Sequence, residues 1–209
     1  MKKILIFAAA TIVILVSLGL RQIGQIQPRA SGPVFTADNQ LVMPENYREW
    51  VWVSSGLGMS YNPPTQSTGA PDPSFDNVFV TPEAYRSFMQ TGTWPDKTMF
   101  ILEGRSSISN GSINQQGHFQ GQLSGMEAEV KSAGKWTFYK FENTEAGPRY
   151  SPATSARPLQ PPESDRCHSC HLQNGAVDST FVQFYPTLLE VAKQKGTLKN
   201  LQETPPSKP

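Results

Sequence analysis

The stretch Cys167-His168-Ser169-Cys170-His171 contains both cysteines of this 209-residue chain. Two cysteines that are separated by two residues and followed directly by a histidine form the attachment signature of c-type haem. The two thiols bond covalently to the haem, and the adjacent histidine becomes an axial ligand of the iron. The motif therefore predicts one covalent haem c per chain, attached through Cys167 and Cys170, with His171 as the metal ligand.

Other uses of a Cys-x-x-Cys pair stay open on the sequence alone. A redox dithiol of the thioredoxin kind is expected early in a domain, at the start of a helix, whereas this pair lies late and follows a proline-rich segment. A short structural disulfide between the two cysteines is another interpretation. A zinc site needs four ligands, and His118 and His168 could complete one. None of these sites needs a histidine directly after the second cysteine.

Arg166 immediately precedes the motif and is the best candidate for pairing with a haem propionate, because guanidinium groups bind carboxylates with two hydrogen bonds. Arg105 is a second candidate for this role. The predicted cofactor-binding residues are therefore Cys167, Cys170, His171 and Arg166.

The N-terminus carries an export signal. Met1-Lys2-Lys3 precedes an apolar run from Ile4 to Leu20, and Arg21 ends it, so residues 1–21 read as a signal peptide or an N-terminal membrane anchor. The two lysines place the rest of the chain outside the cytoplasm. We expect a periplasmic protein, either soluble after cleavage or anchored to the inner membrane. The formal net charge of +1 gives no indication of a nucleic-acid partner.

The position of the motif, late in the chain, separates this protein from small helical cytochromes c, in which it lies near the start. Runs of β-branched and aromatic residues instead predict antiparallel strands at residues 50–53, 75–80, 98–103, 126–131 and 136–142. Helices are expected at 44–49, from Pro82 to before Gly92, and at 187–195. Residues 105–117 read as a polar connection and 146–164 as an extended approach to the motif. The fold class is α+β, a mostly antiparallel sheet with a few helices and a haem attached near the C-terminus.

Several stretches resemble the cytochrome P-460 family, which includes the β-type cytochromes c-prime. They are Tyr47–Met59, Asn77–Arg86, Gly92–Asp96, Lys135–Phe141 and, after the late Cys-x-x-Cys-His, Asp178–Pro186. The resemblance implies a homodimer and a haem iron with one histidine ligand and an open or weakly occupied distal side. Members oxidise hydroxylamine or bind nitric oxide and related ligands. The resemblance covers a haem domain that we place at 43–196; the polar composition of 22–42 predicts a tether, and the proline-rich end predicts a disordered tail at 197–209.

Members of this family that oxidise hydroxylamine also link a lysine to the porphyrin. The strand 98–103 contains no lysine, although Lys97, Lys131, Lys135 and Lys140 are near in sequence. We therefore expect a haem without a lysine bond. This favours ligand binding or electron transfer over hydroxylamine oxidation.

The residues on the distal side of the iron decide between these functions. A methionine would give a six-coordinate electron carrier, and Met59, in a glycine-rich loop, is the candidate least explained by packing. Aromatic residues would form an apolar pocket for neutral diatomic molecules, and a carboxylate could accept protons. The candidates beyond Met59 are Met43, Met89, Met99, Met126, His118, Phe75, Phe79, Phe100, Glu103 and Glu129.

The sequence thus predicts an exported c-type haem protein with His-ligated, five-coordinate iron. It would bind or convert a small nitrogen-oxide ligand, such as nitric oxide or hydroxylamine, and exchange electrons with a redox partner protein. The alternative is an electron-transfer cytochrome c with a sixth axial ligand and no catalysis. A haem enzyme that oxidises hydroxylamine or acts as a peroxidase is a third reading.

Overall fold

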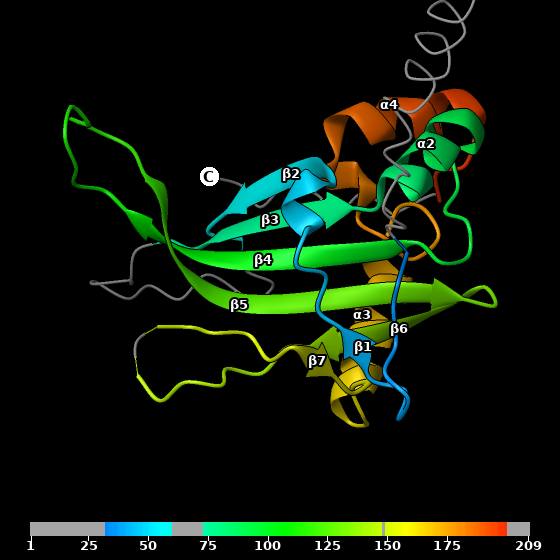
Figure 1. Cartoon of the computed structure of the whole chain (residues 1–209). Coiled ribbons are helices and arrows are strands. Elements are labelled where there is room, and N and C mark those ends of the chain that lie inside the picture. The colour runs from blue at the N-terminus through cyan, green and yellow to red at the C-terminus, as the bar shows by residue number, and fades with distance from the viewer. Residues whose placement is uncertain (1–31, 60–72, 148, 200–209) are drawn as a thin grey trace, which may run out of the picture. The chain divides into compact units, whose positions relative to one another are not determined.

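The computed structural model describes residues 32–59, 73–147 and 149–199. Five strands form one antiparallel sheet in chain order, as Figure 1 shows. They are β2 (Val51–Leu57), β3 (Phe75–Val80), β4 (Met99–Ile108), β5 (Phe119–Ser132) and β6 (Lys135–Lys140). With helices packed against it, this sheet confirms the α+β class.

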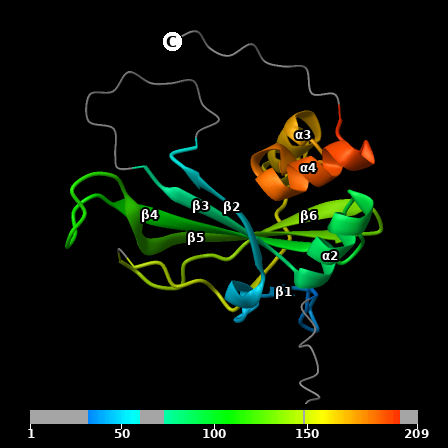
Figure 2. The same cartoon turned by 90° about the horizontal axis from the view of Figure 1, so that it is seen from above.

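The two faces of the sheet bury different side chains, because successive residues of a strand point to opposite sides. Val80, Phe100 and Phe138 belong to one core cluster, together with residues of the C-terminal helix. Ile101, Met126, Tyr139 and other residues form a second cluster. Figure 2 shows α3 (Glu163–Asn174) and α4 (Pro186–Lys195) on one side of the sheet. The 3-10 turn η1 (Tyr47–Glu49) and β1 (Leu41–Val42) lie on the other side.

Two helices lie within one residue of their predicted bounds. α2 (Pro82–Thr91) and α4 both start with a proline, whose missing N–H costs nothing in the first turn. They end at Gly92 and Gly196, which adopt left-handed φ angles of 73° and 66°. Thr81 occupies the N-cap position of α2, but its side chain makes no capping hydrogen bond.

The hairpin formed by β4 and β5 is longer than predicted. The prediction of a polar connection at 105–117 is therefore partly wrong. β4 continues to Ile108, and β5 starts at Phe119. Arg105 pairs with Leu123 and Ser107 with Gln120, with irregular register on both sides of Arg105. Backbone pairing does not require apolar side chains, so hydrophobic alternation stops before the strands do.

The cysteine motif lies on a helix that the sequence analysis did not predict. Residues 146–164 were expected to be extended, and they contribute the short strand β7 (Ser155–Ala156) before α3 begins at Glu163. The short helix expected at 44–49 is the single turn η1. A second 3-10 turn, η2 (Val182–Phe184), connects the region after α3 to α4.

Packed structure extends beyond both expected boundaries of the haem domain. Leu41, within the segment expected to be a tether, is fully buried, and β1 pairs with β7. Thr197, within the expected tail, donates a hydrogen bond from Oγ1 to the carbonyl of Gly92 at 2.8 Å. The predicted signal segment 1–21 and the end of the tail at 200–209 lie outside the described residues. Within the described ranges, no helix has the length and apolar character needed to span a membrane.

Replacing Leu41 by alanine should destabilise the protein, because the side chain is fully buried. A buried leucine truncated to alanine costs about 2–5 kcal/mol. Urea unfolding followed by tryptophan fluorescence measures this loss. Val34→Ala is the matched control, since Val34 is 58% exposed, and its effect should stay within about 0.5 kcal/mol. Equal effects of the two substitutions would show that β1 does not belong to the folded domain.

Candidate haem site

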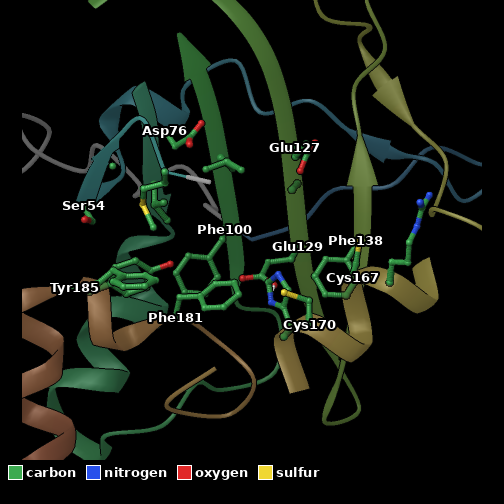
Figure 3. Close-up of a pocket in the computed structure, with 18 residues that line it drawn as sticks. Ser54, Asp76, Phe100, Glu127, Glu129, Phe138, Cys167, Cys170, Phe181 and Tyr185 are labelled. Carbon is green, nitrogen blue, oxygen red and sulfur yellow. Dashed lines mark ion pairs between the residues drawn. The ribbon is translucent and has the colours of Figure 1, made fainter. Parts of the chain in front are cut away.

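A cavity of about 410 Å³ lies between the sheet and the C-terminal helical segment. Its walls include Val78, Phe100 and Leu102 from the sheet and Phe181 and Tyr185 from the region after α3. Figure 3 shows Cys167 and Cys170 beside Phe138, with Phe181, Phe100 and Tyr185 extending across the other side. The volume falls in the range of cofactor and ligand sites, and the apolar walls are typical of them.

The three residues of the haem signature line this cavity together. Cys167, Cys170 and His171 are three and four residues apart on α3, a spacing that puts side chains on one face of a helix. His168 is not among the cavity-lining residues, and its ring packs edge-on against Phe138 at 4.9 Å. Both histidines of the motif therefore contact Phe138, but among the two only His171 lines the cavity, as attachment of a haem at this motif requires.

The cysteines are unlike a reactive dithiol. Both are free, and Cys167 is the fifth residue of α3, beyond the first turn where a helix would stabilise a thiolate. Burial raises the pKa of the Cys167 thiol, and the neighbouring Glu127 and Glu163 add to this effect. Nucleophilic cysteines of redox dithiols have a lowered pKa, so the environment of Cys167 differs from that of a redox dithiol.

His171 is held with one ring nitrogen engaged. Its Nδ1 lies 3.0 Å from the carbonyl oxygen of Ser179, and since a carbonyl can only accept, Nδ1 carries the proton. The rings of Phe138 and Phe181 pack edge-on against the imidazole at 4.7 and 4.6 Å. Burial lowers the pKa of His171 and favours the neutral ring. Nε2 then keeps its lone pair for a metal, as a haem ligand requires. The donor set and the cavity fit a c-type haem.

Glu129 is the predicted carboxylate that the structure brings to the cavity. Its Oε2 is buried without a hydrogen-bond partner among the described residues, and it lies 3.3 Å from Nδ1 of His171. Burial, with a smaller contribution from Asp178, raises the pKa of Glu129 to about 8. At neutral pH the group is mostly a neutral acid. Sequence reasoning missed Glu127 and Asp76, which also line the cavity. Glu127 could have been found, because residues two apart on a strand point to the same face and Glu129 was already a candidate.

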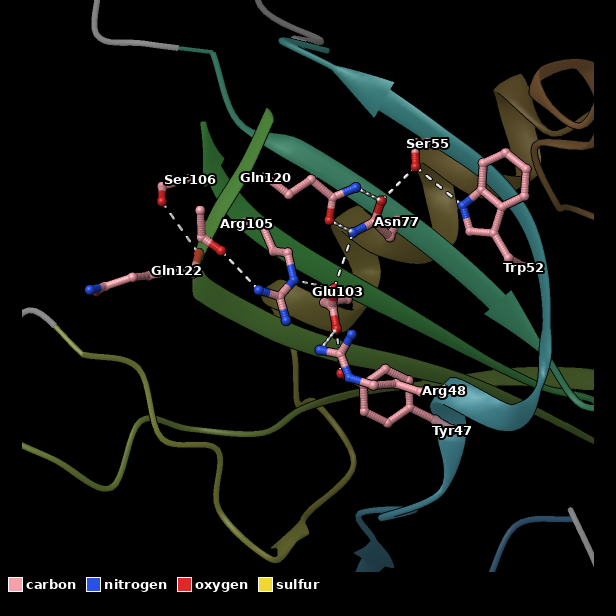
Figure 4. Close-up of polar contacts among 11 residues, drawn as sticks. Tyr47, Arg48, Trp52, Ser55, Asn77, Glu103, Arg105, Ser106, Gln120 and Gln122 are labelled. Carbon is pink, nitrogen blue, oxygen red and sulfur yellow. Dashed lines mark hydrogen bonds and ion pairs between the residues drawn. The ribbon is translucent and has the colours of Figure 1, made fainter. Parts of the chain in front are cut away.

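Glu103 was also predicted to approach the iron, and this prediction is wrong because the side chain points to the opposite face of the sheet. It is 1% exposed and lies among polar side chains, as Figure 4 shows. Arg48 and Arg105 each bond to its carboxylate at 2.5 Å, and Tyr47 donates its hydroxyl. Burial opposes ionisation of Glu103, but the bonds from Arg105 and Tyr47 outweigh it and lower the pKa.

Of the two arginines predicted to pair with a haem propionate, one lies at the cavity and the other on the opposite face of the sheet. Arg166 lines the cavity, where it could meet a propionate. Arg105 lies on the far face and is bound to Glu103, so its proposed role toward the haem is contradicted.

The remaining distal candidates divide between the cavity and the rest of the molecule. Met59 and Phe100 line the cavity. Met99 and Met126 are buried in the core on the other face, with Met43 and Phe79 packed against it, and Met89 is 37% exposed. Phe75 and the exposed His118 are not among the lining residues, and none of the four candidate lysines is. Within the described ranges, no group of three or more His, Cys, Asp or Glu side chains is arranged to hold a metal ion.

Glu103→Gln and Glu129→Gln should affect stability to very different extents, although both residues lie on the sheet. The substitution at position 103 would remove the charge that binds Arg48, which is about half exposed, and Arg105, which is mostly buried, so the expected cost is about 1.5–3 kcal/mol. A glutamine at position 129 imitates the neutral acid and should change stability by about 1 kcal/mol or less at pH 7. Chemical denaturation at pH 7 measures both.

The loss caused by Glu103→Gln should also depend on pH. Because the pKa of Glu103 is lower in the folded protein than its ordinary value of 4.5, its stabilising effect is complete above that pH. It disappears as the pH falls through the folded-state pKa, so the wild-type and the variant should converge in acid. A constant difference through the acid range would contradict the ion-pair account.

Comparison with known proteins agrees with this site. No curated protein matches the chain. The sequence model of the cytochrome P460 family, however, matches residues 44–182. The matched region contains β2 to β6, the haem signature and the turn that carries Ser179. Because the match covers more than half of the chain, this protein belongs to the cytochrome P460 family.

Proposed function

We propose that this chain is an exported c-type haem protein with five-coordinate iron that binds or converts a small nitrogen-oxide ligand, such as nitric oxide or hydroxylamine. Family membership implies the haem. The observation that carries the proposal is the state of His171, whose Nδ1 bonds to Ser179 while the ring lies in the same cavity as both thiols. In this arrangement His171 supplies one axial ligand, and Cys167 and Cys170 hold the macrocycle.

The other cavity walls support an open sixth position. His171 is the one histidine among the described residues that line the cavity, and no described lysine lines it. Apolar groups such as Val78, Phe100 and Leu102 supply most of the sheet-side wall. An apolar distal environment admits small neutral ligands and disfavours anions. Nitric oxide and hydroxylamine are both small and neutral at pH 7.

Carboxyl groups of the cavity support conversion of a ligand as well as binding. Burial raises the pKa of Asp76, which lines the cavity, whereas Glu129 contacts Nδ1 of His171 and so belongs to the proximal side. A carboxyl group whose pKa is raised toward the working pH can both give and accept protons. Oxidation of hydroxylamine releases protons together with electrons, so such a group suits this substrate. The electrons would leave to a redox partner protein.

Export and dimerisation complete the proposal. The basic, then apolar N-terminal segment supports a periplasmic location, either soluble or anchored. The homodimer follows from the family resemblance. The absence of lysine from the described cavity walls supports a haem without a lysine bond.

Met59 supports the alternative function, an electron carrier with a methionine as sixth ligand. This residue lines the cavity, and its side chain folds over Gly56 so closely that a Cβ at position 56 would overlap the sulfur. Glycine at this position therefore lets a thioether approach the cavity wall. A methionine ligand would raise the reduction potential and block access to the iron.

Covalent attachment is tested by haem staining after denaturing electrophoresis. Protein matured with a competent haem-attachment system should give a stained band, and Cys167→Ala combined with Cys170→Ala should abolish it. Mass spectrometry should find haem on the peptide with Cys167 and Cys170 alone. A haem-linked peptide containing Lys97, Lys131, Lys135 or Lys140 would disprove the expected attachment and favour hydroxylamine oxidation.

Coordination is tested by optical spectra of the ferrous protein with and without carbon monoxide or nitric oxide. His171→Ala should change the spin state, whereas His168→Ala should leave the spectrum almost unchanged, because His168 lies outside the cavity lining. Carbon monoxide should bind without displacing a protein ligand, and Met59→Leu should not alter the spectrum. A wild-type protein with a low-spin spectrum that becomes high-spin in Met59→Leu would establish the electron carrier instead.

A further inference from the structure

The carbonyl that binds His171 belongs to a strained two-residue turn. Val177 and Thr180 pair across it, and the amide of Thr180 donates to the carbonyl of Val177 at 2.8 Å. Its central residues, Asp178 and Ser179, have φ angles of 49° and 59°. Positive φ at both central positions is the pattern of a type I′ turn, which favours Asn-Gly. Asp-Ser does not favour this conformation strongly, so surrounding contacts must maintain it.

Side chains from distant parts of the chain supply those contacts. The ammonium group of Lys131, on β5, forms an ion pair with the carboxylate of Asp178. The indole N–H of Trp136, on β6, donates to the carbonyl of Asp178 at 2.8 Å. The indole N–H of Trp94 donates to Oγ1 of Thr180, also at 2.8 Å. Asp178 is therefore fixed to the sheet, and Thr180 is fixed to Trp94 in the segment before β4.

Lys131 is itself held rigidly. It is 9% exposed, and its Nζ also donates to the carbonyl of Trp94 at 2.8 Å. The Nζ lies 5.9 Å from the centre of the Trp136 ring. Trp94 and Trp136 both pack against Phe100, at 4.8 and 5.9 Å between ring centres. The cation thus has a fixed position from which it can orient Asp178.

The other side of the turn lies directly on the end of α3. A Cβ on Gly175 would lie 2.5 Å from the carbonyl carbon of Ser179 and 2.6 Å from the carbonyl oxygen of His171. Only glycine leaves room for this approach. The turn is therefore enclosed between the helix end and the polar contacts from the sheet, with the Ser179 carbonyl directed at the imidazole.

We propose that Lys131, Asp178 and Trp136 are positioning residues for the axial ligand, and we call these three residues the proximal latch. The latch holds the Ser179 carbonyl where it accepts the Nδ1 proton of His171. A fixed acceptor sets the tautomer and orientation of the ring and increases the basicity of Nε2 toward iron. This inference rests on the proposed function, in which His171 coordinates the haem.

The test uses the full-length protein with haem attached. Lys131→Met combined with Asp178→Ala removes the ion pair without leaving one buried charge unpaired and without changing the net charge. The Fe–His stretching frequency of the ferrous protein, measured by resonance Raman scattering, should fall. The reduction potential should become more positive, because a less basic ligand stabilises ferric iron less.

A rescue and a control identify the cause. Lys131→Met combined with Asp178→Asn and Ser179→Gly gives the turn its preferred Asn-Gly sequence without the ion pair, and it should restore both values toward wild-type. Lys193→Met combined with Glu190→Ala removes an exposed ion pair on α4 and should change neither value. Trp136→Phe removes one donor to the turn and should shift both values in the same direction as the first variant, by less.

The outcomes separate the latch from a purely structural role. If Lys131→Met with Asp178→Ala lowers the melting temperature but leaves the stretching frequency and the potential unchanged, the proposal is wrong. If that variant yields no haem-bearing protein, Trp136→Phe provides the test: an unchanged stretching frequency and an unchanged potential in this variant would show that the proposal is wrong. If the wild-type iron is six-coordinate, the proposed function fails, but the reduction potential still tests the latch. If His171→Ala leaves the haem spectrum unchanged, both proposals are wrong.

Discussion

Successive side chains of a β-strand point to opposite faces of a sheet, and in this protein that constraint decides which residues can meet the haem. Phe100 and Glu129 lie on the face that lines the cavity. Ile101 is buried in the core of the opposite face, and Glu103 points to that same face. Two carboxylates on neighbouring strands therefore have opposite properties. The pKa of Glu103 is lowered within an ion-pair network, and the pKa of Glu129 is raised because the group is buried beside the cavity.

Much of the fold could be predicted from local pattern. The strand at 75–80, the helix from Pro82 and the helix ended by Gly196 have strong signals, because β-branched runs, N-terminal prolines and C-terminal glycines act through the backbone of a few residues. The polar part of the β4–β5 hairpin could not be predicted, because its stability comes from backbone pairing, which leaves no hydrophobic pattern. Helix α3 was missed because few of its residues are apolar, and Ser164 is its one buried residue.

The candidate site could be predicted only where its chemistry is local in sequence. Cys167, Cys170 and His171 lie within about one turn of helix, so their spacing alone predicts them as candidates. Choosing between Glu103 and Glu129 required knowing which face of the sheet the C-terminal segment covers, and no strand encodes this by itself. The contact between Lys131 and Asp178 joins residues 47 positions apart in the sequence. In the sequence, Asp178 stood out only as part of a stretch that resembles the family, and its ion pair with Lys131 is visible only in the structure.

In the proposed arrangement, attachment of the haem and orientation of its ligand are separate tasks of different parts of the chain. Helix α3 contains both thiols and the imidazole of the haem signature. An isolated helix, however, leaves Nδ1 to water, which accepts its proton without fixing the ring. The Ser179 carbonyl replaces that water with an acceptor whose position depends on β5, β6 and Trp94. By this proposal the sheet acts on the axial ligand through the turn at Asp178 and Ser179 as well as through the cavity wall. Phe100 links the two because it contacts both tryptophans and lines the cavity.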